Sequence, residues 1–530
     1  MRIAIYFLKL GLKFIAFTGF YFVIMAYFVL FAIGWKAEEL GIQNNSSIEL
    51  SQISVFVIGV LLSFFTTLRN IIRKAKPDFS FINMLLGMRR NRRNRPRKRK
   101  EVSETYENID KSYIGLENGV VFGKMRTNYL VMPQNTEGHI MVVGGQGSGK
   151  SSSIAIPTLL NYNSSIFAID IKGELSEIRK RYNKGTIKVF EPLNKYSPHY
   201  DPYLVLKDGD KIQGAREIVN SIITIPPEEK DPYWKQSAQN LMTACILHYE
   251  DEGKDFPTTC KEILEKPVNE LISVLKSSRV REIKLFISQF EGADTKQLAS
   301  IYSTLSNEII LFATDKDIMR ALSKEGDIIS PHDLEVETDI FIKLSEDKLE
   351  QWKALLNLLV SQFLKSFEKR KDKTDKKILF MIDEFPRLGK VKSITNGLST
   401  LRSKGIQIML IMQSLAQLDM IYGKDNRKVI TDNCNYKIIL NASDVDTQEY
   451  FSKLVGTVDI EKKSSSINSN DFSVASNRGV STSTEEKRII KPEEFAYLEN
   501  PVVFTPKGFF RPQKVKWYED KIFLERANNN

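Results

Sequence analysis

The chain has 530 residues, enough for two or three domains, and 42% of them are hydrophobic, which is ordinary for a globular protein. Its three cysteines and four histidines form no CxxC pair and no His/Cys cluster, so neither a disulfide framework nor a zinc site is indicated. The net charge of +11 comes from residues 69–100, which hold 13 Lys or Arg and one acid, and the rest of the chain has 63 basic and 64 acidic residues. The charge therefore does not indicate a basic catalytic domain.

Two uncharged stretches lie near the N-terminus, at residues 14–35 and 50–68. Each is long enough to cross a hydrocarbon core of about 30 Å as a helix. Lys and Arg flank the outer ends of the pair, whereas the connection 36–49 carries one lysine and three glutamates. The positive-inside rule then places both termini in the cytoplasm. We expect residues 1–76 to form a transmembrane anchor with two spans.

A polar neck follows at residues 77–111, and its densest basic run is 89–100. Such a run can lie against anionic lipid head groups, to which each basic residue adds about 1 kcal/mol near the membrane surface. It can also contact the phosphates of a passing nucleic acid. The sequence does not decide between lipid binding and nucleic-acid contact for this run.

From residue 112 onward the pattern is globular, and strands alternate with helices, which predicts an α/β fold with a parallel sheet. The expected strands are residues 119–122, 129–132, 139–143, 165–169, 186–190, 339–344, 377–382, 406–412 and 437–440, and we expect residues 502–504 and 515–517 to close the sheet edge. Residues 211–326 show only helical stripes. The predicted domains are a nucleotide-binding domain at 112–210 and 327–518, an inserted all-α domain at 211–326, a Ser/Asn-rich mobile loop at 461–487 and a tail at 519–530.

Residues 144–151 fit the phosphate-loop pattern G-x-x-x-x-G-K-[ST], between an apolar strand and a helix-compatible run. Glycines let backbone N–H groups close around phosphates, and the start of the helix adds positive potential. Lys150 would reach the β- and γ-phosphates, and the Ser151 hydroxyl would ligate Mg²⁺. The expected nucleotide-binding residues are Gly144, Gly145, Gln146, Gly147, Ser148, Gly149, Lys150, Ser151 and Ser152.

Three further strands end in polar residues, and ligands of open α/β sheets lie outside the carboxyl ends of the strands. One strand ends at Asp170, and another ends in the Walker B-like pair Asp383-Glu384. Asp383 would hold Mg²⁺ through a bound water, and Glu384 would act as general base or orient the attacking water. Gln413, at the end of the third strand, would sense the γ-phosphate or position the attacking water. These assignments predict an ATPase that uses Mg²⁺.

Arg402 lies eleven residues before Gln413. It could act as an arginine finger on the ATP of a neighbouring subunit, a contribution typically worth about 10³–10⁵ in rate. It could equally be an exposed arginine at a helix end, stabilised by the helix dipole. The spacing alone leaves both interpretations open.

Taken together, these residues resemble the type IV coupling proteins, the TraG/TraD-like membrane ATPases of bacterial conjugation and type IV secretion. The matching pieces, in chain order, are residues 144–151, 156–160, 170–174, 231–234, 382–385, Arg402 with Gly405, 413–414, 417–418, 422–423, and Arg488 with 492–494.

The resemblance implies a RecA-like domain with an inserted all-α domain, assembled as a homo-hexamer under the bacterial inner membrane. It implies ATP-driven delivery of single-stranded DNA with its relaxase, or of effector proteins, into a secretion channel that has its own ATPases. It also places Arg402 at the arginine-finger position. The short connection at 36–49 and the absence of a long acidic C-terminal tail depart from many members of the family.

The alternative is a septal, chromosome-pumping DNA translocase of the same motor superfamily. Such pumps usually carry more spans and a C-terminal winged helix, for which residues 515–530 leave no room. A membrane-anchored metalloprotease is excluded because no H-E-x-x-H motif is present. The sequence does not distinguish a DNA–relaxase cargo from protein effectors.

Overall fold

The computed structural model of the protein describes residues 109–530, apart from 183–184, 208, 227–228, 468–477 and 529–530. The expected spans at 14–35 and 50–68 and the basic run at 89–100 lie outside these residues. Among the residues that the structure describes, no helix combines the length and the apolar character needed to cross a membrane.

The central element is a nine-stranded sheet with the order β13-β12-β9-β3-β8-β7-β4-β6-β5. The seven strands from β9 to β5 are parallel, and β12 and β13 add an antiparallel edge. The strands are β3 (Ile140–Val143), β4 (Ile166–Asp170), β5 (Thr186–Phe190), β6 (Thr338–Lys343), β7 (Ile378–Ile382), β8 (Ile406–Met412), β9 (Tyr436–Ile439), β12 (Val502–Thr505) and β13 (Gly508–Phe510).

Both faces of this sheet are buried, which is why its strands are continuous apolar runs in the sequence. Along β3, Met141 packs into one core, and the adjacent Ile140 packs into the other. The first core is covered by α16 (Lys353–Ser366), α17 (Lys392–Thr400) and α18 (Leu415–Tyr422). The second is covered by α5 (Ile156–Leu159), α6 (Glu174–Tyr182), α21 (Lys521–Asn528) and the hairpin of β1 (Gly119–Met125) with β2 (Asn128–Pro133).

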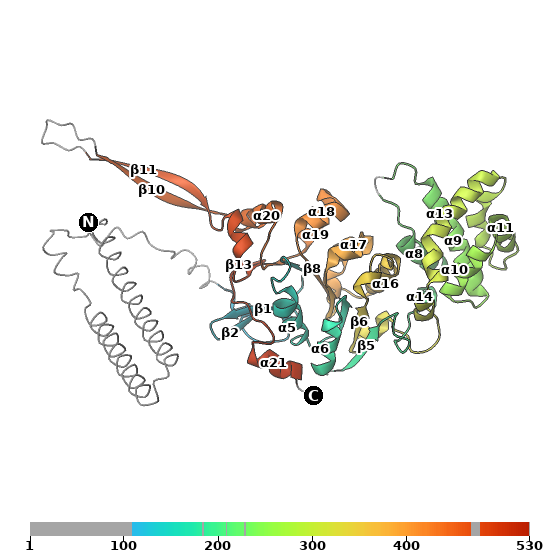
Figure 1. Cartoon of the computed structure of the whole chain (residues 1–530), viewed down its shortest axis with the longest axis horizontal. Coiled ribbons are helices and arrows are strands. Elements are labelled where there is room, and N and C mark those ends of the chain that lie inside the picture. Colours follow the sequence, from blue (N-terminus) through green and yellow to red (C-terminus); the bar gives the residue numbers. More distant parts are fainter. Residues whose placement is uncertain (1–108, 183–184, 208, 227–228, 468–477, 529–530) are drawn as a thin grey trace, which may run out of the picture. The chain divides into compact units, whose positions relative to one another are not determined.

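Between β5 and β6 the described chain is helical, and α8 packs on α16 beside the sheet (Figure 1). The helices of this block are α7 (Leu204–Lys207), α8 (Lys211–Ile222), α9 (Tyr233–Asp251), α10 (Phe256–Glu265), α11 (Val268–Lys276), α12 (Ile283–Ile287), α13 (Thr295–Thr314), α14 (Lys316–Ala321) and α15 (Pro331–Glu335). The stripes expected from the sequence are buried: Leu241 and Cys245 on α9, and Ile301 and Leu305 on α13, are at most 1% exposed.

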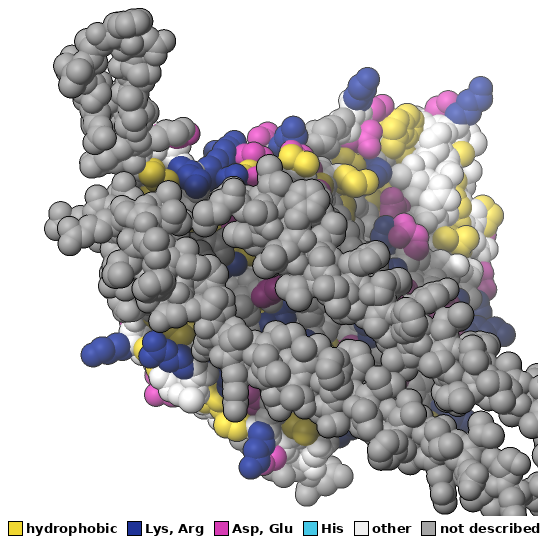
Figure 2. Space-filling model, turned by 60° about the vertical axis from the view of Figure 1, so that its left-hand side comes forward, with side chains coloured by type: hydrophobic (Ala, Val, Ile, Leu, Met, Phe, Trp, Pro, Cys, Tyr) yellow, Lys and Arg dark blue, Asp and Glu magenta, His cyan; other side chains and the backbone are white. Residues whose placement is uncertain are grey.

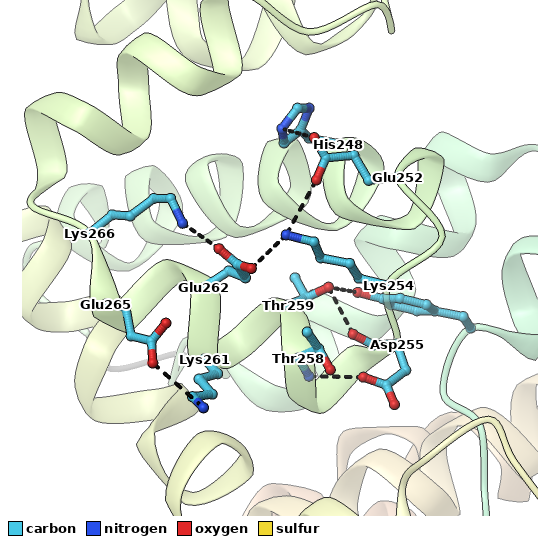
Figure 3. Close-up of polar contacts among 11 residues, drawn as sticks. His248, Glu252, Lys254, Asp255, Thr258, Thr259, Lys261, Glu262, Glu265 and Lys266 are labelled. Carbon is cyan, nitrogen blue, oxygen red and sulfur yellow. Dashed lines mark hydrogen bonds and ion pairs between the residues drawn. The ribbon is translucent and has the colours of Figure 1, made fainter.

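A chain of ion pairs joins the end of α9 to α10 (Figure 3). Lys254 Nζ lies 2.6 Å from a carboxylate oxygen of Glu262 and 3.4 Å from one of Glu252, and Glu262 also pairs with Lys266. His248 Nε2 lies 3.4 Å from Glu252. Because Glu252 and Glu262 are each paired with a lysine, their charges are compensated within the helical block.

The segment predicted as a mobile loop at 461–487 forms two strands, not a loop, in its described part. The strands β10 (Thr457–Ile467) and β11 (Arg478–Arg488) pair antiparallel, with Thr457 opposite Arg488 and Ile467 opposite Arg478. The segment shows no sustained apolar alternation in the sequence, and the two strands are joined by the backbone hydrogen bonds of an antiparallel ladder. The ribbon follows α20 (Val445–Val455), which comes after α19 (Lys424–Asn433), and extends away from the sheet (Figure 1).

The antiparallel edge also differs from the expectation. Residues 502–504 do belong to an edge strand, β12, but residues 515–517 form no strand. The outermost strand is β13, which turns back on β12 with Thr505 opposite Gly508. This leaves the segment after β13 free to cross the carboxyl edge of the sheet, where it contacts the phosphate loop.

Candidate active site

Four strand ends that the sequence marked as polar are neighbours in the sheet. The strands run in the order β3, β8, β7, β4, so Lys150, Gln413, the Asp383-Glu384 pair and Asp170 follow one another along a single edge. All four strands are parallel, so these residues emerge on the same side. The fold therefore assembles groups that are up to 263 positions apart in the sequence.

The phosphate loop depends on its glycines for its shape. Gly147 and Gly149 have φ values of 71° and 96°, a region that residues with a Cβ rarely adopt. A Cβ on Gly144 would collide with the hydroxyl of Ser148. After Gly149 the chain winds as a π-helix, Lys150–Ala155, before it becomes α5. Wide turns of this type are frequent at functional sites.

Lys150 folds back onto its own loop. Its Nζ donates to the carbonyl oxygens of Gly144 at 2.7 Å and Gly145 at 3.0 Å. Burial lowers the pKa of Lys150, and the charges of Asp383 and Glu384 oppose this shift. The amide N–H of Gly145 donates to Asn441 Oδ1 at 2.7 Å, so β9 also contributes to holding the loop. The ammonium group thus rests on neutral acceptors that an anion can replace.

Asp383 is a buried carboxyl group, 4% exposed, directly after β7. Burial, followed by the charge of Glu384, raises its pKa from 3.8 to about 6, against the opposing charges of Lys172 and Lys150. Within the described part of the chain it makes no ion pair, and one of its oxygens accepts from the Glu384 N–H at 3.1 Å. A buried carboxylate that makes no ion pair fits the place of a hydrated Mg²⁺.

Glu384 has a left-handed backbone, with φ 52° and ψ 46°, before the 3₁₀ turn Phe385–Leu388. This conformation costs a residue with a Cβ roughly 1–2 kcal/mol. Its carboxylate lies between two cations, 3.1 Å from Arg387 Nη1 and 3.7 Å from Lys172 Nζ. Arg387 also pairs with Glu346 at 2.5 Å. The strained turn and the two cations together fix where the Glu384 carboxylate points.

The other two strand ends have different surroundings. Asp170 accepts from the Ser176 N–H at 2.8 Å and from the Ser176 hydroxyl at 2.7 Å, so its carboxylate supports the first turn of α6. Gln413 is half-buried at the end of β8, and its N–H donates to Gln417 Oε1 at 3.3 Å. The Asp170 carboxylate therefore makes a structural contact, whereas Gln413 follows β8, the strand next to the one that Asp383 follows.

Arg402 is not brought together with these residues. It lies in the 3₁₀ turn Arg402–Lys404 that precedes β8, at the amino edge of the sheet, and its side chain is exposed. Seven strand residues separate it from Gln413, about 20 Å. Burial, helped by the charge of Arg402, lowers the pKa of nearby His139 to about 3. A role for Arg402 at a phosphate loop would therefore require the loop of a second copy.

Sequence reasoning missed four residues that contact the site: Lys172, Arg387, Asn441 and Lys514. Lys172 lies within the 170–174 segment and Arg387 lies just after the acid pair, so position alone could have suggested them. Asn441 and Lys514 come from segments far along the chain, and no local pattern marks them. Lys514 Nζ donates to the carbonyl oxygen of Ser148 at 2.8 Å.

Replacing Asp383 with asparagine is expected to stabilise the nucleotide-free protein at alkaline pH. With a folded-state pKa of about 6 against 3.8, ionised Asp383 disfavours the folded state by about 3 kcal/mol above pH 6. This penalty shrinks as the pH falls below 6 and disappears below about 3.8. Thermal melts of Asp383→Asn at pH 8 should therefore show a higher Tm than wild type, with a smaller difference at pH 4.5. Exposed Asp375→Asn is the control, and an equal or lower Tm for Asp383→Asn at pH 8 would contradict the prediction.

The strand order, the glycine loop after β3 and the acidic pair after β7 define an α/β P-loop NTPase fold. The chain belongs to the family described as type IV secretory system conjugative DNA transfer, whose model matches residues 93–530. This match confirms the resemblance to type IV coupling proteins that the motifs indicated.

Individual relatives agree with the family. Protein VirD4 of Agrobacterium fabrum (strain C58 / ATCC 33970) is 25% identical over 426 residues, which cover 76% of this chain and 63% of VirD4. Conjugal transfer protein TraG of Escherichia coli is 25% identical over 360 residues, which cover 61% of this chain and 56% of TraG. The chain thus spans about three fifths of the length of these curated relatives.

Solved structures of the plasmid coupling protein TrwB share the fold. The structure of TrwB in complex with the ATP analogue ADPNP matches with a TM-score of 0.60 at 17% identity. The match covers 78% of this chain and 91% of the TrwB chain. TrwB in complex with ADP and Mg²⁺ has a TM-score of 0.59 at 18% identity, with coverages of 73% and 87%. At this identity the likeness concerns the fold.

Proposed function

We propose that the protein is a membrane-anchored ATPase that couples single-stranded DNA with its relaxase, or protein effectors, to a type IV secretion channel. The observation that carries this proposal is the convergence of Lys150, Asp383-Glu384 and Gln413 at one sheet edge, in a chain of the conjugative DNA transfer family. The TrwB complexes with ADPNP and with ADP and Mg²⁺ support nucleotide and Mg²⁺ binding here.

The residues divide the chemistry of ATP hydrolysis among them. Lys150 binds the β- and γ-phosphates, and Ser151 and Asp383 hold Mg²⁺, which supplies positive charge to the phosphate oxygens. Glu384 accepts a proton from water as the water oxygen bonds to the γ-phosphorus and the bond to the β,γ-bridging oxygen breaks, giving ADP and phosphate. Gln413 donates to the γ-phosphate or to that water.

The proposed organisation is a homo-hexamer of RecA-like domains, each with its inserted all-α domain, held under the bacterial inner membrane by the spans at 14–35 and 50–68. The uncharged stretches and their flanking charges support the anchor, with both termini in the cytoplasm. On the face seen in Figure 2, the visible basic and acidic side chains are interspersed. Outside residues 69–100 the basic and acidic residues are nearly balanced in number. Binding to DNA is therefore expected to depend on local groups of basic residues and not on the net charge of the domain.

The family match favours this function over the septal DNA translocase. A mating assay tests it: a deletion strain carrying the wild-type chain should transfer its plasmid, and one carrying Lys150→Ala should not. An effector-translocation reporter in the same strains separates DNA from protein cargo. Transfer at wild-type frequency by Lys150→Ala, with equal protein levels, would refute the proposed ATP-driven coupling.

We expect Arg402 to act in trans, because the amino edge of its own sheet lies far from its own phosphate loop. Mixing Arg402→Ala with Lys150→Ala subunits should then recover part of the ATPase activity, since some interfaces pair an intact arginine with an intact loop. The nearby Lys404→Ala, mixed in the same way, is the control, since Lys404 is half-buried and pairs with Asp372. No recovery under conditions in which mixed rings form would count against this role.

A further inference from the structure

The segment after β13, residues 511–520, crosses the phosphate loop, and we call it the C-terminal strap. Gln513 pairs with Lys124 of β1 through two backbone hydrogen bonds of 2.7 and 3.0 Å. Further along, the Trp517 N–H donates to the carbonyl oxygen of Ser152 at 3.0 Å. Asp520 accepts from the Tyr129 hydroxyl at 2.7 Å and pairs with Lys124. The strap is therefore fixed on both sides of the loop.

Lys514 lies between these two anchor points. Besides the bond from its Nζ to Ser148, its aliphatic stem lies 3.6 Å from where a Cβ of Gly149 would be. Its backbone N–H donates to Asn500 Oδ1 at 3.2 Å, which fixes the start of the side chain. The side chain is half-buried, and among the described residues it has no carboxylate partner within ion-pair distance. Burial and the charge of Lys516 lower its pKa.

We propose that Lys514 is a second phosphate-binding cation of the nucleotide site, contributed by the C-terminal strap. Lys150 provides the parallel: it also rests on neutral carbonyl oxygens of the loop, those of Gly144 and Gly145. A phosphate oxygen accepts a stronger, charge-assisted hydrogen bond than a carbonyl does, so a bound polyphosphate would draw the ammonium away from Ser148. This inference rests on the proposed ATP-binding function and names a residue that the phosphate-loop motif does not contain.

The neighbouring cation of the strap offers a matched comparison. Lys516 pairs with Glu519 at 2.8 Å, so its charge is already compensated, and among the described residues no hydrogen bond or ion pair joins its side chain to the loop. Loss of the Lys516 charge leaves the strap and its anchors intact. A difference between the two positions therefore reports on the contact with the nucleotide and not on the net charge of the segment.

The test uses the purified full-length protein and measures the Kd of Mg-ADP and of a fluorescent ATP analogue, together with KM and kcat. Lys514→Met keeps the aliphatic stem and removes the charge, and it should raise both Kd and KM about tenfold with kcat within about twofold. Lys514→Arg should restore most of the binding, and Lys516→Met should resemble wild type. The Kd of wild type should rise more steeply with salt than that of Lys514→Met.

Unchanged binding by Lys514→Met would overturn the proposal. Equal loss of binding in Lys514→Met and Lys514→Arg, with a lowered Tm in both, would also overturn it, because the side chain would then only brace the loop. Absence of nucleotide binding by the wild-type protein would instead refute the proposed ATPase. The two failures are therefore distinguishable.

Discussion

Replacing Glu384 with glutamine is expected to lower kcat for ATP hydrolysis about 10²–10⁴-fold while nucleotide binding persists. Glutamine keeps the shape of the side chain but cannot accept the proton of the attacking water. Because Glu384 follows β7 and its ion pairs are with Lys172 and Arg387, outside the phosphate loop, the Kd of Mg-ATP should change little. Steady-state phosphate release and equilibrium binding of a fluorescent ATP analogue measure the two effects separately.

Glu346→Gln is the control for this experiment. Glu346 pairs with the same Arg387 at 2.5 Å but follows β6, and 67% of its side chain is exposed. If loss of an ion pair to Arg387 were responsible, both variants would lose activity. Normal hydrolysis by Glu384→Gln would exclude the general-base role, and equal losses in both variants would assign the effect to Arg387.

Replacing Lys150 with alanine is expected to reduce ATP hydrolysis at least about 10²–10³-fold, the typical cost of removing one preorganised donor to transition-state charge. Binding of ATP should weaken as well, because Lys150 is the cation of the loop itself. Lys150→Arg is expected not to rescue, since the planar guanidinium cannot occupy the position of a compact ammonium. Phosphate release by the purified protein measures both variants.

Lys172→Ala is the comparison for the Lys150 variants. Lys172 is also a cation close to the acidic pair, with its Nζ 3.7 Å from a carboxylate oxygen of Glu384. Unlike Lys150, it lies on the loop after β4, outside the phosphate loop, and its side chain is 56% exposed. A milder effect is expected there. ATPase activity of Lys150→Ala at the wild-type level would show that the phosphate loop does not carry hydrolysis.

The local parts of the site could be predicted from the sequence. The phosphate loop is a continuous segment, and its glycines are required by backbone angles that only nearby residues set, as Gly147 and Gly149 demonstrate. The strands could be recognised because both faces of the sheet are buried, which makes each strand a nearly continuous apolar run. In β8, Ile406–Met412, all seven residues are buried and only Gln407 is polar. The acids Asp170 and Asp383-Glu384 could be placed at strand ends because each stands where an apolar run ends.

The hairpin of β10 and β11 could not be predicted in this way. Its strands are rich in Ser, Thr and charged residues and show no sustained apolar alternation, so the segment resembles a loop in the sequence. Pairing between them is decided by backbone hydrogen bonds across the ribbon, with Thr457 opposite Arg488. Backbone hydrogen bonds of this kind form with nearly any side chains, so the amino-acid composition of the segment does not reveal the pairing.

The sequence by itself determined the class of chemistry, because the residues that would hold phosphate are consecutive: Gly144 to Ser151 form a cradle through local backbone geometry. Only the tertiary structure decided which distant groups share that cradle. It placed Gln413 after β8, which adjoins β3, and Asp383 after β7, the next strand along. It also set Arg402 at the opposite edge and carried Lys514 across the loop. The reason is physical: strand order and the path of the C-terminal strap are fixed by packing between segments hundreds of residues apart, which no local pattern encodes.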